Sequence, residues 1–222
     1  METEKKSLAG CSDEVCWSYM KDGCKDSLEV LYLRFYNNLF DYAVSFCGDA
    51  DTAEDQIHAL FLKIWERREL LPEVEYVKTY LWTSLRRSLI DEKRRQFRLD
   101  TTINLLKIYD FTMVSSPEEI RLYEEHNQEV LLQLYKAVQQ LQSRQREVIY
   151  LKFFEGMSYR EIEAITSLSY QSVRNYTSEA VKTLRYALKK SAARESGPVH
   201  LALINTFSIW LSFCSIFSLF SL

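Results

Sequence analysis

Residues 158–188 read SYREIEAITSLSYQSVRNYTSEAVKTLRYAL, a stretch that predicts two consecutive helices joined by a tight turn. Ser158 followed by Glu161 is a capping box, a pattern with which many helices begin. The turn is predicted at Ser167–Ser169, and a longer helix is predicted from Tyr170 to about residue 190. This layout is typical of a helix-turn-helix, whose second helix enters the major groove of DNA.

The predicted second helix has an apolar face and a polar face. Its inward stripe consists of Val173, Thr177, Ala180, Val181 and Leu184. The candidates for DNA contact are Tyr170, Gln171, Ser172, Arg174, Asn175, Ser178 and Lys182. Gln and Asn side chains pair with adenine in the major groove, and Arg pairs with guanine or phosphate. A helical hairpin without a DNA role would have a similar pattern, so this segment alone does not name the function.

The composition predicts a folded and mostly helical protein. Of the 222 residues, 47% are hydrophobic and 27% are charged, but only five are glycine and three are proline. Turn residues are therefore too few for a β-sandwich or barrel. The expected fold class is all-α, with two small helical domains joined by a flexible linker.

Basic residues are concentrated in two segments, although the formal net charge of the chain is −3. Residues 78–98 contain seven basic and two acidic residues, and residues 169–194 contain six basic and one acidic residue. Acidic stretches separate the two segments. This distribution indicates two DNA-contacting surfaces, while ordinary solvated helix faces are the alternative for either segment alone.

Three helices are predicted in the N-terminal half, over residues 28–47, about 51–66 and about 75–96. Each has apolar residues three or four positions apart. The stripes are Leu28, Leu31, Phe35, Leu39 and Tyr42, then Ala53, Ile57, either Leu60 or Phe61, and Ile64, then Val77, Leu81, Leu85 and Leu89. Gly48 is expected to end the first helix, and Asp51 is expected to cap the second.

The remaining segments complete the predicted organisation. Residues 1–27 are polar and are expected to form a loose leader, so the first domain spans residues 28–98. Residues 99–124 lose the helical pattern and predict a linker. The second domain, residues 125–194, is expected to contain helices over about 124–141 and 143–155 ahead of the helix-turn-helix. Residues 199–222 form an apolar tail without a charge.

Two parts of the chain resemble bacterial sigma factors. LQSRQREVIYLKFFEGMSYREIEAI, residues 141–165, resembles their region four. LYLRFYNNLFDYAVSFCGDADTAEDQIHALFLKIWERRE, residues 31–69, resembles region two, and VKTYLWTSLRRSLIDEKRRQ, residues 77–96, resembles the family helix that follows. Both patterns occur in the family's order without further domains. The chain is therefore similar to the small extracytoplasmic-function group of sigma factors.

The resemblance implies binding to core RNA polymerase and promoter DNA, recognition of the −35 and −10 elements, and help in promoter melting. It assigns the −35 element to the helix-turn-helix. Capture of the −10 strand is expected from Lys78, Trp82, Arg86, Arg87, Lys93 and Arg94, because basic groups follow phosphates and aromatic rings stack on bases. The resemblance also places base capture in the loop of residues 67–75, and Tyr76 is a further stacking candidate. Contact with polymerase is expected from Asp55, His58, Ala59 and Leu62.

The sequence departs from the family pattern at three places. His58 and Ala59 stand where the family often has Gln-Glu. Leu85 to Arg87 replace the common Ala-Arg-Asn, which leaves readout of the melted element open. Ser167 occupies the position of the turn glycine, at some cost in backbone energy if the turn needs a positive φ.

Other functions are less well supported by the residues. Five cysteines without a C-x-x-C pair and three scattered histidines give no basis for a disulfide framework or a metal site, and no cofactor motif or catalytic pair is present, so no cofactor or enzymatic activity is expected. The alternatives are a helix-turn-helix regulator, or an interaction protein attached to the membrane through residues 199–222. The expected location is the cytoplasm, at the nucleoid, and an anti-sigma factor is a candidate partner.

Overall fold

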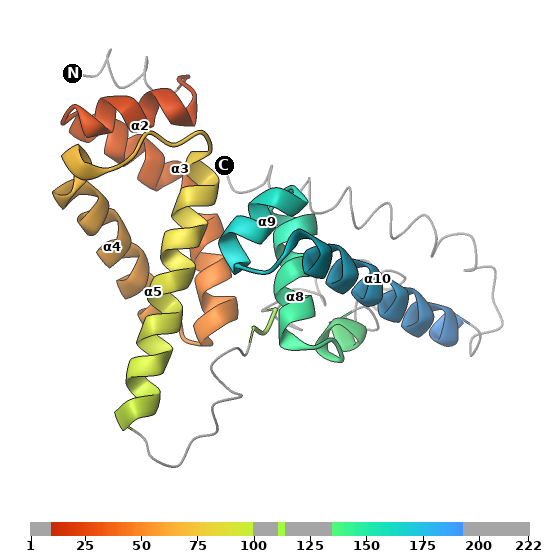
Figure 1. Cartoon of the computed structure of the whole chain (residues 1–222). Helices are drawn as coiled ribbons and strands as arrows, with labels where there is room; N and C mark the ends of the chain where they lie inside the picture. Colours follow the sequence, from red (N-terminus) through yellow and green to blue (C-terminus); the bar gives the residue numbers. More distant parts are fainter. Residues whose placement is uncertain (1–9, 100–110, 114–134, 193–222) are drawn as a thin grey trace, which may run out of the picture. The chain divides into compact units, whose positions relative to one another are not determined.

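The computed structural model describes residues 10–99, 111–113 and 135–192 (Figure 1). Every regular element in these ranges is a helix. The N-terminal unit contains α2 (Asp13–Lys21), α3 (Lys25–Cys47), α4 (Ala50–Glu66), η1 (Arg68–Leu70) and α5 (Val77–Leu99). The C-terminal unit is built on residues 111–113, α8 (Ser143–Ile149), η3 (Tyr150–Phe154), most of α9 (Tyr159–Thr166) and α10 (Tyr170–Ala192). The predicted all-α, two-unit fold is confirmed.

The core of the N-terminal unit is formed by the predicted apolar stripes. α3 packs against α2, α4 and α5. All residues of the three stripes are buried except Leu28, which is half-buried. Gly48 ends α3 with a φ of 78°, a left-handed conformation that glycine adopts without a steric penalty.

α4 begins two residues earlier than expected. Its N-cap is Asp49, not Asp51, and the Asp49 carboxylate accepts a 2.8 Å hydrogen bond from the backbone N–H of Thr52. Hydrogen bonds from Thr52 hold the pKa of Asp49 below its ordinary value, because they favour the ionised carboxylate. Both aspartates suit the first turn of a helix, so local sequence did not separate them.

The expectation of a loose leader over residues 1–27 is wrong for its second half. Ser12 caps α2, whose side chains Cys16, Trp17 and Met20 are completely or almost completely buried. Arg34 on α3 donates a 2.7 Å hydrogen bond to the carboxylate of Asp13. These contacts make α2 part of the N-terminal unit. The three buried residues of α2 have the spacing i, i+1 and i+4, which is too short a pattern to predict a helix from the sequence alone.

The C-terminal unit departs from prediction in how its helices are divided. Residues 135–139 are helical, and the earlier part of the helix expected over 124–141 lies outside the described residues. The helix expected over 143–155 is divided into α8 and the π-helical η3. α8 packs against α10, and the Gln145 side chain donates a 3.2 Å hydrogen bond to Glu179 on α10.

The expected linker of residues 99–124 contains a docked segment. Phe111 and Met113 are buried in the C-terminal unit. The Arg146 guanidinium donates to the carbonyl oxygens of Phe111 (2.5 Å) and Leu141 (2.7 Å), and the Phe111 N–H donates to the hydroxyl of Ser143 (2.5 Å). This segment therefore belongs to the second unit rather than to the linker.

Candidate nucleic-acid interface

The helix-turn-helix forms as predicted. In the capping box of α9, Ser158 and Glu161 exchange hydrogen bonds of 2.8 and 3.3 Å between side chain and backbone. Ser167 ends α9 in the left-handed region, with a φ of 57°. The Glu163 carboxylate then accepts a 2.9 Å hydrogen bond from the backbone N–H of Tyr170, the first residue of α10. The turn therefore fixes where the second helix starts.

Glu163 is a positioning residue that sequence reasoning missed. Its carboxylate satisfies one of the N–H groups that lack a partner at the start of a helix. The Tyr159 and Tyr170 rings meet edge to face at 5.9 Å between centroids, which adds a second tie between α9 and α10. An acidic residue seven positions before a helix start has no recognised local pattern, so only the folded turn brings the two groups together.

The face of α10 predicted to contact DNA is solvent-accessible. Tyr170, Gln171, Arg174, Asn175, Ser178 and Lys182 are exposed, and Ser172 is half-buried. The opposite stripe of Val173, Thr177, Ala180 and Leu184 is buried, and Val181 is half-buried. The Gln171 amide donates a 3.0 Å hydrogen bond to the Asn175 side chain, so two candidate base-reading groups are already held beside each other. Contact of this face with DNA remains a prediction.

On α5, two of the predicted strand-capture residues are in the core. Trp82 is 0% exposed and meets Phe35 edge to face, with ring centroids 6.1 Å apart. Arg86 is 4% exposed. In this conformation neither side chain is accessible to a DNA strand, so their assignment to strand capture is corrected. The inward stripe predicted on α5 was too narrow, because this helix is covered by α2, α3 and α4.

The other basic residues predicted on α5 are accessible to different degrees. Arg87 and Arg94 are exposed, and Arg94 forms a 3.4 Å ion pair with Asp91. Lys78 and Lys93 are half-buried, with their ammonium groups 5.2 Å from the Trp82 ring centroid and 4.9 Å from that of Phe46. Both lysines therefore interact with aromatic rings of their own unit. Their roles toward DNA remain predictions.

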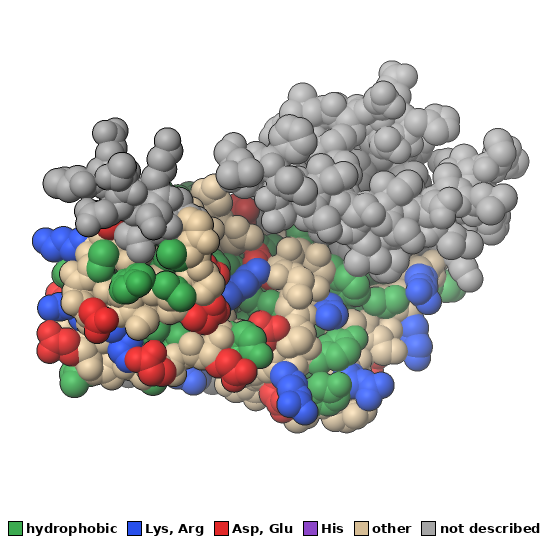
Figure 2. Space-filling model, turned by 90° about the horizontal axis from the view of Figure 1, so that it is seen from above, with side chains coloured by type: hydrophobic (Ala, Val, Ile, Leu, Met, Phe, Trp, Pro, Cys, Tyr) green, Lys and Arg blue, Asp and Glu red, His purple; other side chains and the backbone are tan. Residues whose placement is uncertain are grey.

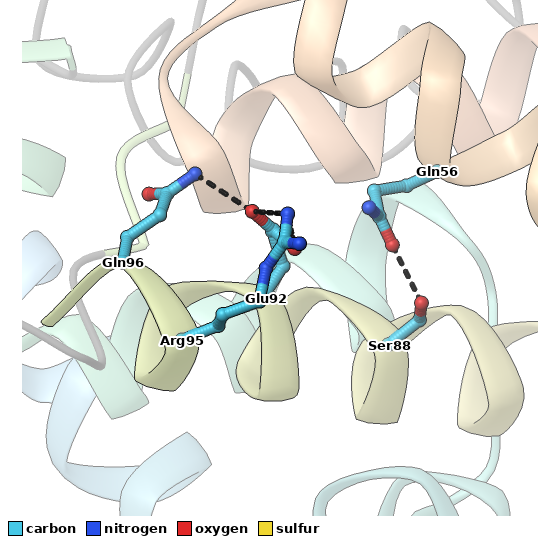
Figure 3. A network of polar contacts seen from close by, with 5 residues as sticks. All are labelled: Gln56, Ser88, Glu92, Arg95 and Gln96. Atoms are coloured by element: carbon cyan, nitrogen blue, oxygen red, sulfur yellow. Dashed lines mark hydrogen bonds and ion pairs between the residues drawn. The ribbon is translucent and has the colours of Figure 1, made fainter. Parts of the chain in front are cut away.

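Polar contacts join α5 to α4 and also link residues within the C-terminal part of α5 (Figure 3). The Ser88 hydroxyl donates a 2.5 Å hydrogen bond to Gln56 on α4. Further along α5, Glu92 accepts hydrogen bonds from Arg95 (2.9 Å) and Gln96 (3.1 Å). The hydrogen bond from Arg95 lowers the pKa of Glu92. This hydrogen bond therefore stabilises the folded state at pH values above the pKa that the Glu92 carboxyl has in the unfolded chain. The stabilisation is lost as the pH falls through the lower pKa of the carboxyl in the folded protein.

The residues predicted to face polymerase share one exposed side of α4. Asp55, His58, Ala59 and Leu62 are all exposed. The spacing i, i+3, i+4 and i+7 places them along one face of a helix. The Tyr32 hydroxyl lies 3.1 Å from Nε2 of His58, and burial raises the pKa of this tyrosine. The four exposed residues of α4 are accessible to a partner, and their contact with polymerase remains a prediction.

Surface charge by itself does not mark a site. On the face seen in Figure 2, basic, acidic and hydrophobic side chains of the described residues are interspersed. No group of three or more His, Cys, Asp or Glu side chains in the described part of the chain is arranged to bind a metal ion. The candidate interfaces are therefore defined by which side chains share a helix face.

Comparisons with known proteins identify the family. The model for sigma-70 region 2 matches residues 31–99, and that for sigma-70 region 4 matches residues 131–184. The ECF RNA polymerase sigma factor SigL of Mycobacterium tuberculosis is 26% identical over 164 residues, which cover 73% of this chain and 89% of the relative. The chain belongs to the ECF-type sigma factors. SigX of Bacillus subtilis, another ECF sigma factor, is 23% identical to this sigma factor over 72% of the chain and 83% of the relative.

Solved structures show the same fold for this sigma factor. CnrH, determined in complex with the cytosolic domain of CnrY, matches with a TM-score of 0.53 and 18% identity over 80% of this chain and 97% of CnrH. The sigma factor RpoE, determined with the anti-sigma factor NepR from Bartonella quintana, matches with a TM-score of 0.52 and 23% identity over 72% of this chain and 94% of RpoE.

The protein is therefore a promoter-recognising sigma factor of RNA polymerase, which is a transcription initiation factor. The family resemblance drawn from the sequence is confirmed. Within the described ranges, no helix is long and apolar enough to cross a membrane. The apolar segment at residues 199–222, whose membrane attachment was only an alternative, lies outside these ranges.

Proposed function

We propose that this sigma factor divides promoter recognition between its two units. α10 reads the −35 element as duplex DNA, and the N-terminal unit captures one strand of the −10 element while α4 docks on core RNA polymerase. The observation that carries the proposal is the contrast between the two faces of α10, one buried and one bearing Gln171, Arg174 and Asn175 in solvent. Amide and guanidinium groups on one exposed helix face are suited to read base edges in the major groove.

For the −10 strand, the proposal relies on an exposed residue in the middle of α5 and on exposed residues in the loop before this helix. Arg87 is exposed on α5. In the loop of residues 67–76, the Leu70 side chain is 85% exposed and the Tyr76 side chain is 55% exposed. An aromatic ring left in solvent can stack on an unpaired base and an aliphatic side chain can pack against one, while the arginine neutralises phosphate charge. These groups replace Trp82 and Arg86 in the proposed strand path.

For polymerase, the proposal uses the exposed side of α4. Leu62 supplies a large apolar side chain that is 59% exposed on this side. Asp55 and His58 add polar groups on the same face, about two turns and one turn before it. An apolar centre with a polar rim is the usual composition of a protein–protein interface.

We also propose that an anti-sigma factor regulates the protein from the same unit. The related CnrH and RpoE were solved with CnrY and NepR, respectively. The exposed Leu33 on α3 and Leu62 on α4 are candidates for such a contact. Because polymerase and promoters occupy the bacterial cytoplasm, we place the function there, and we propose no enzymatic activity.

Binding to core polymerase followed by transcription tests the proposal. Full-length protein is mixed with core RNA polymerase from the source bacterium, and the purified complex transcribes a library of random DNA fragments. We expect defined start sites preceded by two common elements. Leu62→Arg should weaken core binding about tenfold or more, as loss of a central interface contact does, whereas the neighbouring exposed Lys63→Gln should not. Absence of both core binding and specific transcripts would overturn the proposal.

A further inference from the structure

The loop between α4 and α5, residues 67–76, lies beside α2 (Figure 1). Its only regular turn is η1, and residues 71–76 have no regular secondary structure. A segment without backbone pairing of its own keeps one conformation only if neighbouring groups hold it. The proposed strand capture needs a loop that is already ordered. A loop that became ordered only on binding DNA would lose conformational entropy at that step, and its affinity for the strand would be lower.

Trp17 of α2 joins this loop to the start of α5. Its indole N–H donates a 3.3 Å hydrogen bond to the carbonyl oxygen of Pro72. The same ring packs edge to face on Tyr80, with centroids 5.0 Å apart. The side chain is 1% exposed, so the N–H has been removed from water and needs this acceptor.

The end of α2 holds one further point of the loop and lies close to a second. The Lys21 ammonium, on a side chain only 17% exposed, forms an ion pair with Glu73. The turn after α2 passes close to η1, because a Cβ added at Gly23 would lie 3.9 Å from Nε of Arg68. Arg68 is itself fixed, since its guanidinium lies 4.6 Å from the Trp65 ring centroid and donates to the Trp65 carbonyl oxygen at 3.1 Å.

We infer that α2 is a brace that sets the conformation of the 67–76 loop for strand capture, with Trp17 as its main positioning residue and the Lys21–Glu73 pair as a second tie. This inference rests on the proposed role of the loop in capturing the −10 strand. α2 precedes the segment matched by the region 2 model, which begins at residue 31. The brace is therefore supplied from outside the matched segment.

Three variants of the full-length protein separate bracing from folding. Trp17→Phe keeps an aromatic ring against Tyr80 but removes the N–H that donates a hydrogen bond to the Pro72 carbonyl oxygen. Glu73→Gln, at the end of the ion pair that is 77% exposed, loosens the second tie without touching the core. Glu14→Gln, also on α2 and exposed, is the matched control.

Hydrogen exchange and promoter opening are measured on each variant. We expect Trp17→Phe to raise amide exchange in residues 68–76 about two- to tenfold, the range set by one net hydrogen bond, with protection of α3 and α5 unchanged. Glu73→Gln should show a smaller rise, and Glu14→Gln none. On a promoter fragment selected by the wild-type complex from the random library, permanganate reactivity of −10 thymines should fall by a similar factor while core affinity is retained.

Two results would overturn the inference. Exchange of the loop at the wild-type level in both Trp17→Phe and Glu73→Gln would show that α2 does not brace it. Faster exchange with normal promoter opening would show that bracing does not serve strand capture. If the wild-type complex selects no promoter at all, the proposed function fails instead, and the exchange data still decide whether the brace exists.

Discussion

α5 and α10 are both 23-residue amphipathic helices from segments with the same excess of positive charge, yet they present that charge differently. On α5, Arg86 is buried, and Lys78 and Lys93 lie against aromatic rings. On α10, Arg174 and Lys182 are exposed. The difference follows from the number of neighbours: α2, α3 and α4 all pack against α5 and cover part of its basic face, although Arg87 and Arg94 stay exposed. Counting charges in a sequence therefore predicts how many are present, but not how many are available to DNA.

The largest expected effect tests the assignment of Trp82 to the core. Trp82→Ala should lower the free energy of unfolding of the N-terminal unit by about 3–5 kcal/mol, because it removes a large buried ring. Trp82→Phe should cost much less, since the indole N–H of Trp82 is buried without an acceptor among the described residues. Chemical denaturation followed by circular dichroism measures both. A stable Trp82→Ala variant with a specific defect in promoter opening would restore the stacking role.

Adjacent arginines on α5 give a sharper contrast. Arg86→Ala should lower unfolding free energy by about 1–3 kcal/mol through lost packing of its buried stem, and it should affect DNA only as folding is lost. Arg87→Ala should leave stability within about 0.5 kcal/mol of wild type but reduce open complexes several-fold. Thermal melting and permanganate footprinting distinguish them. The reverse pattern would mean that α5 presents a different face in the polymerase complex.

The exposed helix is tested by specificity rather than stability. Arg174→Ala should weaken binding to the −35 element by about 1–3 kcal/mol if it contacts a base edge, without a comparable loss on random duplex. Lys182→Ala, two turns further along α10, should weaken both by a similar amount, as a phosphate contact does. Fluorescence anisotropy of the holoenzyme at fixed salt measures both. Equal losses for Arg174→Ala on specific and random DNA would exclude base readout at this position.

The smallest effect concerns the turn that positions α10. Ser167→Gly should stabilise the C-terminal unit by about 0.5–1 kcal/mol, because glycine adopts its positive φ of 57° without the penalty that a side chain incurs. Promoter specificity should not change. Thermal unfolding provides the measurement. Ser169→Gly is a contrasting variant that should not stabilise, because the Ser169 hydroxyl accepts a 3.2 Å hydrogen bond from the Ser172 N–H at the start of α10. Destabilisation by Ser167→Gly would show that contacts of the serine side chain outweigh backbone strain.

Several local features were predicted from particular residues. The capping box of Ser158 and Glu161, the end of α3 at Gly48 and the inward stripe of α10 all follow from interactions within a few positions of one another. Where two acidic residues satisfied the same local rule, as at Asp49 and Asp51, the prediction chose the wrong one. The leader was misread because Cys16, Trp17 and Met20 form too short a pattern to indicate a helix alone.

The sequence by itself determined the helical class, the two units, the helix-turn-helix and the sigma-factor family, because these depend on periodicity, caps and motif order along the chain. Only the tertiary structure decided which polar and aromatic side chains stay in solvent. Trp82 and Arg86 are buried by helices distant in sequence, and Trp17 finds its acceptor 55 residues away at Pro72. Apolar periodicity predicts that a helix buries one side and exposes the other. A helix that packs against several neighbours also buries part of the side that the periodicity predicts to be exposed.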